Sequence, residues 1–198
     1  MFKTDMSLIR PLILFTLFGA AAGVPTEAHS TPPRGHVGAI ASAFDLETLD
    51  GHSVRSKRLR GHRIVLVVGT TQGSAPRCKR WMEPLLRDYP PKKSPVEVFQ
   101  VVVVDKAWYL PKSLVRSKLE GFVGKAFHDR FLIEWKTAFG ERYGVPRSSL
   151  PVVLLIDKSG VIRWRLRDTY TKARYRALRR AINGPAAASQ TTTRQPHP

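Results

Sequence analysis

The sequence predicts an α/β fold in which a central mixed β-sheet is flanked by helices. Strongly apolar runs at residues 64–68, 96–104 and 152–156 are typical of strands covered on both faces, because a sheet with one wet face would alternate apolar and polar residues. Stretches with apolar residues at helical spacing separate these runs. Strands that alternate with helices predict parallel central pairs, and the turn after the last run predicts an antiparallel edge.

The first elements predict an N-terminal hairpin extension of this sheet. Residues 44–49 alternate in polarity and end at a turn, which predicts a strand, and residues 54–59 predict a weak return strand. A helix is expected after the loop that follows residue 68, with Ser74 as a suitable N-cap and Pro76 in its first turn. Its apolar stripe continues past Pro84, which predicts a kink within the helix.

The later elements follow in alternation. Apolar spacing predicts a short strand at residues 131–133 and helices at residues 112–127, 136–143 and 171–182. After the strand at residues 152–156, a turn at residues 157–160 leads into a segment that alternates strictly. That alternation predicts one charged face, with Arg163, Arg165 and Arg167, and one apolar face, with Ile162, Trp164 and Leu166.

The chain divides into four predicted parts. Lys3 and Arg10 precede an apolar run and then small residues, a pattern that predicts a secretory signal peptide over residues 1–28. A membrane anchor is the alternative, but the apolar run is shorter than the roughly 20 residues of a comfortable span. We expect a flexible linker, one folded domain and a disordered tail at residues 29–42, 43–183 and 184–198. The mature chain would then be periplasmic or secreted and have no transmembrane span.

The chain is strongly basic. Its 33 Lys and Arg residues against 15 Asp and Glu give a net charge of +18, which removal of residues 1–28 leaves unchanged. The electric field of this positive charge favours an anionic envelope surface as a partner. Export makes nucleic acid the least expected partner. The alternative is a solvated coat, because no basic-aromatic binding motif is present. The candidate basic face comprises Arg163, Arg165, Arg167, Arg174, Arg176, Arg179 and Arg180.

The order of elements, together with the segment GVPRSSLPVVLLIDKSGVI, resembles the thioredoxin fold over about residues 43–183. The resemblance implies that Pro151 is a cis-proline beside the redox motif. Within this redoxin superfamily, the chain resembles the periplasmic YtfJ-type proteins at VRSKLE, IEWKTAFGERYGV and SSLPVVLLIDKSGVIRW, which are residues 115–120, 133–145 and 148–164. A general redoxin or TlpA-like relationship is the alternative.

The resemblance also locates a degenerate redox motif. Members that exchange disulfides place Cys-x-x-Cys at the start of the first helix, where the helix N-terminus lowers the pKa of the first thiol. Counting forward from the preceding strand puts residues 74–77 there, whereas counting back from the helix puts residues 75–78 there. Both registers remain open, and in both the attacking position has no sulfur. The motif therefore involves Ser74, Ala75, Pro76, Arg77 and Cys78.

Cys78 is the only cysteine, so no intrachain disulfide can form. Its place on an apolar stripe favours an inert, buried thiol. The alternative is a reactive thiol, either of the resolving type or the peroxidatic centre of a one-cysteine enzyme. The peroxiredoxin pattern is missing, because Ala75 and Thr71 stand where that pattern has threonine and proline.

No cofactor or metal is expected, because the histidines lack ligand spacing and no phosphate-binding loop is present. Trp108 and Tyr109 follow a buried strand at its carboxyl end, where open α/β sheets tend to bind ligands. They form a candidate contact edge, and their alternative role is to cap the core.

The sequence thus predicts an exported thioredoxin-fold protein that lacks the dithiol and serves as a non-catalytic binding or adaptor module of the cell envelope. We expect a protein or peptide partner at the edge formed by Ser74 and Pro151. The alternative function is a single-cysteine thiol oxidoreductase or peroxidase that uses Cys78.

Overall fold

The computed structural model describes residues 35–104 and 110–184. The predicted signal peptide, the candidate contact edge at Trp108 and Tyr109, and all but the first residue of the predicted tail lie outside the described residues. Among the described helices, none is both long and apolar enough to cross a bilayer.

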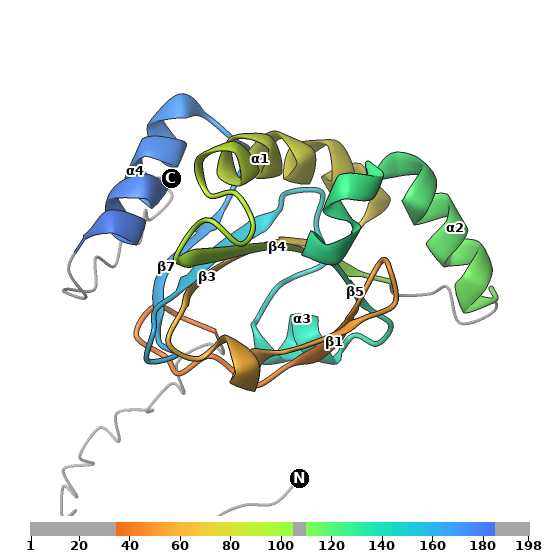
Figure 1. The fold of residues 1–198 in the computed structure, drawn as a ribbon, viewed down its shortest axis with the longest axis horizontal. Coiled ribbons are helices and arrows are strands. Elements are labelled where there is room, and N and C mark those ends of the chain that lie inside the picture. Colours follow the sequence, from red (N-terminus) through yellow and green to blue (C-terminus); the bar gives the residue numbers. More distant parts are fainter. Residues whose placement is uncertain (1–34, 105–109, 185–198) are drawn as a thin grey trace, which may run out of the picture. The chain divides into compact units, whose positions relative to one another are not determined.

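A seven-stranded mixed sheet forms the centre of the fold, with strand order β2-β1-β5-β4-β3-β6-β7 (Figure 1). The central strands β3, β4 and β5 are parallel, and the other neighbours pair antiparallel. This arrangement confirms the predicted α/β class. The strands are β1 (Asp45–Thr48), β2 (Ser53–Arg55), β3 (Arg63–Gly69), β4 (Val96–Val103), β5 (Phe131–Glu134), β6 (Val152–Ile156) and β7 (Ile162–Arg167).

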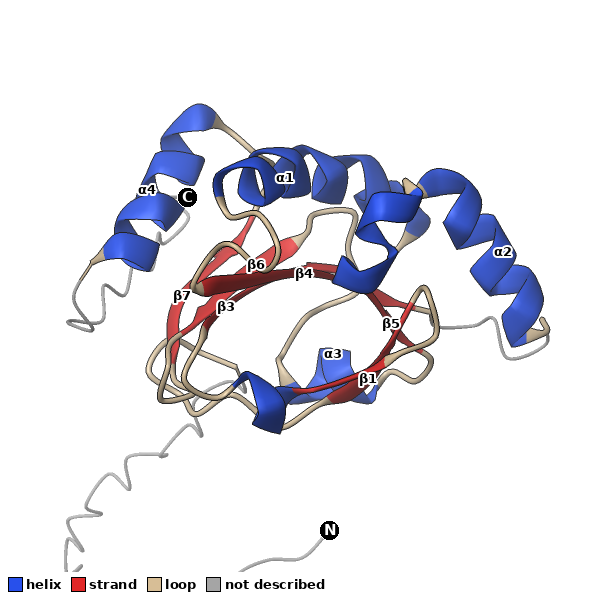
Figure 2. Ribbon diagram, in the orientation of Figure 1, coloured by secondary structure: helices blue, strands red, loops and turns tan. Residues whose placement is uncertain are grey.

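The helices cover the two faces of the sheet unequally (Figure 2). They are α1 (Ala75–Asp88), α2 (Lys112–Phe122), α3 (Ala138–Arg142) and α4 (Lys172–Asn183). Val98 of β4 packs in one cluster with Leu85 of α1 and Leu178 of α4, whereas its neighbour Phe99 packs with Phe139 of α3 on the opposite face. Figure 1 shows α2 on the same face as α1, at the end of the sheet away from α4. The strands β3, β4 and β6 are therefore covered on both sides, as their apolar runs predict.

Two predicted elements end earlier than their sequence patterns suggest. The return strand stops at Arg55, and a 3-10 helix occupies Ser56–Leu59. The helix predicted over residues 112–127 ends at Phe122, and a second 3-10 helix occupies Lys125–Arg130. Glycines at positions 121 and 124 flank this break, and glycine is a poor helix former because it loses more backbone entropy than other residues.

Residues 35–42, here called the N-terminal arm, are ordered along β7. The amides of Gly38 and Ala41 donate to the carbonyls of Ile162 and Gly160, both at 2.8 Å. Tyr143 adds a hydrogen bond from its hydroxyl to the Ser42 carbonyl at 2.5 Å. The prediction of a flexible linker over residues 29–42 is therefore wrong for the arm, because its backbone groups find partners on an edge strand that would otherwise be bare.

A β-bulge in β7 overturns the predicted alternation. Ile162 pairs with Ile156 and Trp164 pairs with Leu155, so Arg163 is an extra residue between them. Ile162 therefore packs on the α3 face, whereas Trp164 packs on the face of α1 and α4. The prediction that Ile162, Trp164 and Leu166 share one face is wrong at Ile162.

The turn before β7 is held by one carboxylate. Asp157 accepts hydrogen bonds from the amides of Ser159 and Val161, both at 2.9 Å, and from Nε of Arg163 at 2.6 Å. Burial acts to raise the pKa of Asp157, but these bonds and the Arg163 charge outweigh it and lower that pKa to about 2. Gly160 has a φ of +86°, the left-handed backbone that the predicted turn requires.

Candidate functional site

Two loops meet at one edge of the sheet and form the candidate site. Strands β3 and β6 pair antiparallel with Val68 opposite Val152, so the loop that follows β3 lies beside the loop that precedes β6. The first of these loops leads into α1 and carries the degenerate redox motif, and the second ends at Pro151. The structure thus brings together the two segments that the sequence resemblance pairs.

Hydroxyl groups hold the two loops together. Oγ1 of Thr70 accepts a hydrogen bond from the Ser148 amide at 2.9 Å, and Oγ1 of Thr71 donates to the Ser148 carbonyl at 3.1 Å. Nη1 of Arg77 donates to the carbonyl of Gly73 at 2.8 Å and reaches that of Ser149 at 3.5 Å. Sequence reasoning missed the role of these hydroxyls, and the only signal was the Thr-Thr and Ser-Ser pairs that flank the two strands.

Pro151 lies where it was predicted but not in the predicted isomer. It is buried and immediately precedes β6. The described residues contain no cis peptide bond, so the bond between Leu150 and Pro151 is trans and the prediction of a cis-proline is wrong. A trans bond is the favoured isomer before proline by about 0.5–1 kcal/mol. The Leu150 amide is already satisfied by Oγ of Ser148 at 3.0 Å.

Neighbouring residues at the start of α1 differ in their exposure to solvent. Ser74 is buried, and its hydroxyl donates to the Thr71 carbonyl at 2.6 Å. It stands at the N-cap position of α1, as predicted, but its backbone is already helical and its side chain makes no capping hydrogen bond to that helix. The hydroxyl turns back into a 3-10 turn, Gln72–Ser74, that precedes α1. Ala75 and Pro76, in contrast, are exposed at the helix N-terminus.

Cys78 is fully buried one turn further along α1. It packs in the cluster that contains Trp81 and Val67. Burial raises the pKa of its thiol to about 12, and a hydrogen bond with Ser74 offsets this only in part. At pH 7 such a thiol is thiolate in only about one molecule in 10⁵. The thiolate is the nucleophile, so burial and the raised pKa both disfavour reaction of this side chain.

Gly69 explains how closely α1 approaches the end of β3. A Cβ atom at position 69 would lie 2.7 Å from Oγ of Ser74 and 3.0 Å from Sγ of Cys78. Only a residue without a side chain fits this contact. The side chains of Ser74 and Cys78 therefore lie directly against the backbone of β3. This contact fixes the start of α1, and with it Ala75, at the end of that strand.

The predicted basic face is not a single surface. Helix α4 covers one face of the sheet, whereas Arg165 and Arg167 alternate with Trp164 and Leu166 and so point to the other face. The arginines of β7 and those of α4 therefore lie over different faces of the sheet.

Several of these arginines also have structural partners. Arg163 pairs with Asp157, Arg174 with Asp168, and Arg179 with Asp88. Arg165 donates to the carbonyls of Gly35, Tyr143 and Gly144 at 2.7–2.8 Å. The exposed members are Arg167, Arg176, Arg179 and Arg180.

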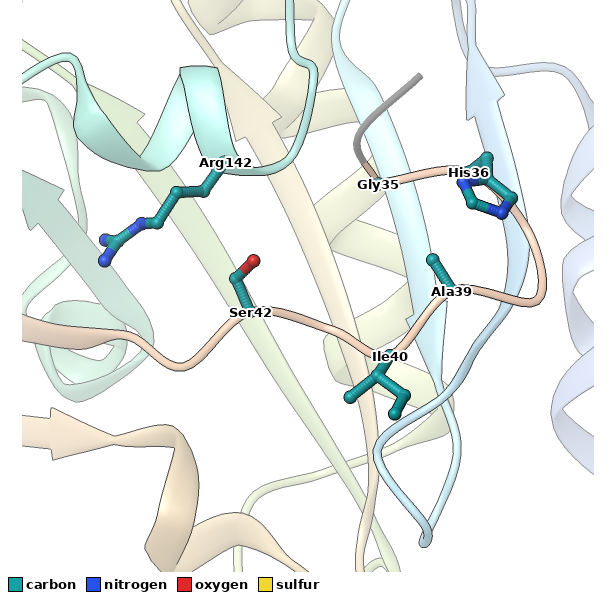
Figure 3. A pocket seen from close by; sticks show the side chains of 6 residues that line it. All are labelled: Gly35, His36, Ala39, Ile40, Ser42 and Arg142. Carbon is teal, nitrogen blue, oxygen red and sulfur yellow. The ribbon is translucent and has the colours of Figure 1, made fainter. Parts of the chain in front are cut away.

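A pocket of about 390 Å³ lies between the N-terminal arm and α3 (Figure 3). His36, Ala39, Ile40 and Ser42 of the arm line it, together with Gly35 and Arg142. In Figure 3 the guanidinium of Arg142 points away from His36, so these two side chains do not converge on one point. Among residues 35–104 and 110–184, no three His, Cys, Asp or Glu side chains form a group that could hold a metal ion.

Comparisons with known proteins identify the fold. The chain is similar to the exposed lipoprotein thioredoxin Etrx1 of Streptococcus pneumoniae, with a TM-score of 0.56 and 19% identity over 70% of this chain and 98% of that one. It is also similar to the thioredoxin domain of a thiol-disulfide oxidoreductase from Bacteroides vulgatus, with a TM-score of 0.55 and 18% identity over 75% and 99%. An uncharacterized conserved protein from Geobacillus kaustophilus gives a TM-score of 0.59 and 17% identity over 79% and 87%. The chain therefore has a thioredoxin-like fold.

Sequence comparison adds no family. No family model matches the chain. No curated protein matches it either. The likeness to the solved structures is thus one of fold.

Proposed function

We propose that this chain is an exported thioredoxin-fold binding module that does not catalyse thiol-disulfide exchange. One observation supports this most directly. The only thiol near the N-terminus of α1 is that of Cys78, which is buried and has a pKa of about 12. An oxidoreductase needs an accessible thiol of low pKa at the first motif position. This chain has a hydroxyl or a methyl group there.

Exposure favours one of the two motif registers. Ala75 is exposed at the first position of α1, whereas Ser74 is buried and bonded to Thr71. An attacking group must be accessible, so Ala75 corresponds to the attacking position and Cys78 to the second, resolving position. The chain would then have a cysteine at the buried second position of a dithiol motif and none at the exposed first position.

The contact surface we propose is the tip where the two loops meet. Gln72, Gly73, Ala75, Pro76 and Ser149 are exposed there. Hydrogen bonds between the loops hold this tip in one conformation, and a preorganised surface loses less entropy on binding. An extended segment of a partner protein is the occupant we propose. The apolar leader pattern and the exposed lipoprotein among the structural neighbours support export. The segments at residues 115–120, 133–145 and 148–164 support a YtfJ-type relationship.

A thiol-labelling measurement tests the non-catalytic part of the proposal. We expect Cys78 in the native protein to react with Ellman's reagent at pH 7 at least about 10³-fold more slowly than free cysteine, because its pKa lies about 3 units higher. Full labelling should follow when denaturant is added. Fast native labelling, or reduction of insulin disulfides at the rate of an active thioredoxin, would instead establish the single-cysteine enzyme.

Hydrogen exchange tests the binding part independently. A permanently unfolded polypeptide, such as reduced and carboxymethylated α-lactalbumin, should slow amide exchange at residues 71–77 and 147–150. Helix α4 serves as the internal control, and its exchange should not change. Equal protection of both regions, or protection of neither, would contradict a peptide site at the tip.

A further inference from the structure

Helix α2 and the 3-10 helix after it carry apolar side chains that the fold leaves uncovered. Large apolar side chains with high exposure in the described part of the chain are Ile40 (80%), Leu114 (44%), Phe122 (83%) and Phe127 (44%). All but Ile40 belong to residues 112–130. No residue of α2 is buried, which is unusual for a helix that packs on a sheet.

The apolar residues of α2 form two ridges with different surroundings. Leu119 is half-buried and packs against the cluster of Leu49, Phe131 and Ile133. Leu114, Lys118 and Phe122 follow one another at a spacing of four, so they lie along one ridge of the helix that is turned to solvent. The ridge is about 12 Å long, from the rise of an α-helix.

Basic side chains accompany the exposed rings. Lys118 stands between Leu114 and Phe122, and Lys125 lies between Phe122 and Phe127 in the sequence. Neither lysine has an ion-pair partner among residues 35–104 and 110–184. An amphipathic helix with exposed aromatic and basic residues is typical of elements that lie in a membrane interface. Lysine suits this setting because its apolar stem can lie along the lipid while its charge reaches the headgroups.

We propose that the ridge of Leu114, Lys118 and Phe122, together with Lys125 and Phe127, docks the protein on an anionic lipid surface. The size of the surface favours lipid over a protein partner. A stable protein interface uses about 20–30 residues on each side, whereas membrane insertion gains free energy side chain by side chain. The net charge of +18 would attract the protein to such a surface.

This surface is distinct from the arginines of β7 and α4. Figure 1 shows α2 at the end of the sheet away from α4, so the two cannot act as one patch. The inference also does not depend on Cys78 or on the loops around Ala75. Failure of the membrane proposal would therefore leave the proposed function intact, and the reverse also holds.

A nitroxide reporter tests the proposal on the full chain. Phe122→Cys can be labelled selectively, because Cys78 is buried. With vesicles of mixed phosphatidylcholine and phosphatidylglycerol, the label at position 122 should become more accessible to oxygen and less accessible to a water-soluble relaxant. With phosphatidylcholine alone, or with the label on Ile40→Cys as the matched exposed control, neither accessibility should change.

Two further pairs of variants measure the contributions of the apolar and the basic side chains. Phe122→Ser should lower the partition coefficient on the mixed vesicles by about tenfold, and Ile40→Ser should leave it unchanged. Charge reversal at Lys118 and Lys125 should lower it at least about tenfold more than the matched reversal at Lys57 and Lys158. The proposal is overturned if the protein does not bind, or if the label at position 122 stays in water on vesicles that carry the protein. Either result would leave an acidic protein surface as the occupant of the ridge.

Discussion

Replacing Ala75 by cysteine should rebuild a dithiol motif, because it creates Cys-Pro-Arg-Cys at positions 75–78. Residues three apart on a helix have Cβ atoms roughly 5–6 Å apart, and a disulfide needs about 3.5–4.5 Å. The first turn of α1 would have to tighten by about 1–2 Å, which a change toward 3-10 geometry allows at a helix end. We therefore expect Ala75→Cys to form an intrachain disulfide with Cys78.

The two thiols of this variant should differ strongly before oxidation. A cysteine at position 75 is exposed at a helix N-terminus, where thiol pKa values fall below about 8.5, whereas the pKa of Cys78 is about 12. At pH 7 the new thiol should react with Ellman's reagent at least about 10³-fold faster than Cys78. The four-residue loop closed by the disulfide should stabilise the oxidised form by at most about 2 kcal/mol.

Mass spectrometry in a glutathione redox buffer and guanidinium unfolding of both redox forms would measure these effects. The double variant Ala75→Cys/Cys78→Ala is the matched control, and it should give only a mixed disulfide with glutathione. If Ala75→Cys does not form the intrachain bond, or if its new thiol is labelled as slowly as Cys78, then Ala75 is not the attacking position and the register is wrong.

Further predictions concern stability. Burial acts to raise the pKa of Asp157, but its hydrogen bonds and ion pair lower that pKa to about 2, below an unfolded value of about 3.9. The ionised Asp157 carboxylate therefore stabilises the fold above pH 4. This contribution of about 2 kcal/mol is lost as the pH falls toward 2. Asp157→Asn should remove that part of the acid dependence in urea unfolding curves, and an unchanged dependence would contradict the assignment. Gly69→Ala should lower the free energy of unfolding by about 1–3 kcal/mol in the same assay, because its methyl group would lie 2.7 Å from Oγ of Ser74. The control Gly121→Ala has open space around the new methyl group and should not destabilise the fold. Arg165→Met should cost about 2–3 kcal/mol and speed amide exchange in the N-terminal arm, and slow exchange there would show that the arm is held without the guanidinium.

The sequence predicted the centre of the fold better than its edges. Strands β3, β4 and β6 lie between two layers, so burial on both faces forces an apolar run that can be recognised without knowledge of the neighbours. Edge elements depend on contacts that sequence patterns do not record. The N-terminal arm looks like a linker by composition, and only its hydrogen bonds to β7 make it part of the sheet edge.

The candidate site was predicted in position but not in detail. The resemblance placed the motif beside Pro151, and the pairing of β3 with β6 brings these segments together. It also implied a cis bond at Pro151, where the structure has a trans bond. The role of Ser74 was missed because a serine before a helix is usually read as its cap, whereas here its hydroxyl bonds back to Thr71.

The loop contacts offer a physical reason why the fold persists without a dithiol. In this chain the junction between β3 and α1 is held by the hydroxyls of Thr70 and Thr71 on Ser148, and by close contact of Cys78 with Gly69. A buried cysteine behaves as a small apolar side chain, so it contributes to packing whether or not a second thiol is present. Loss of the outer cysteine would leave these contacts intact, because position 75 is exposed and takes no part in them.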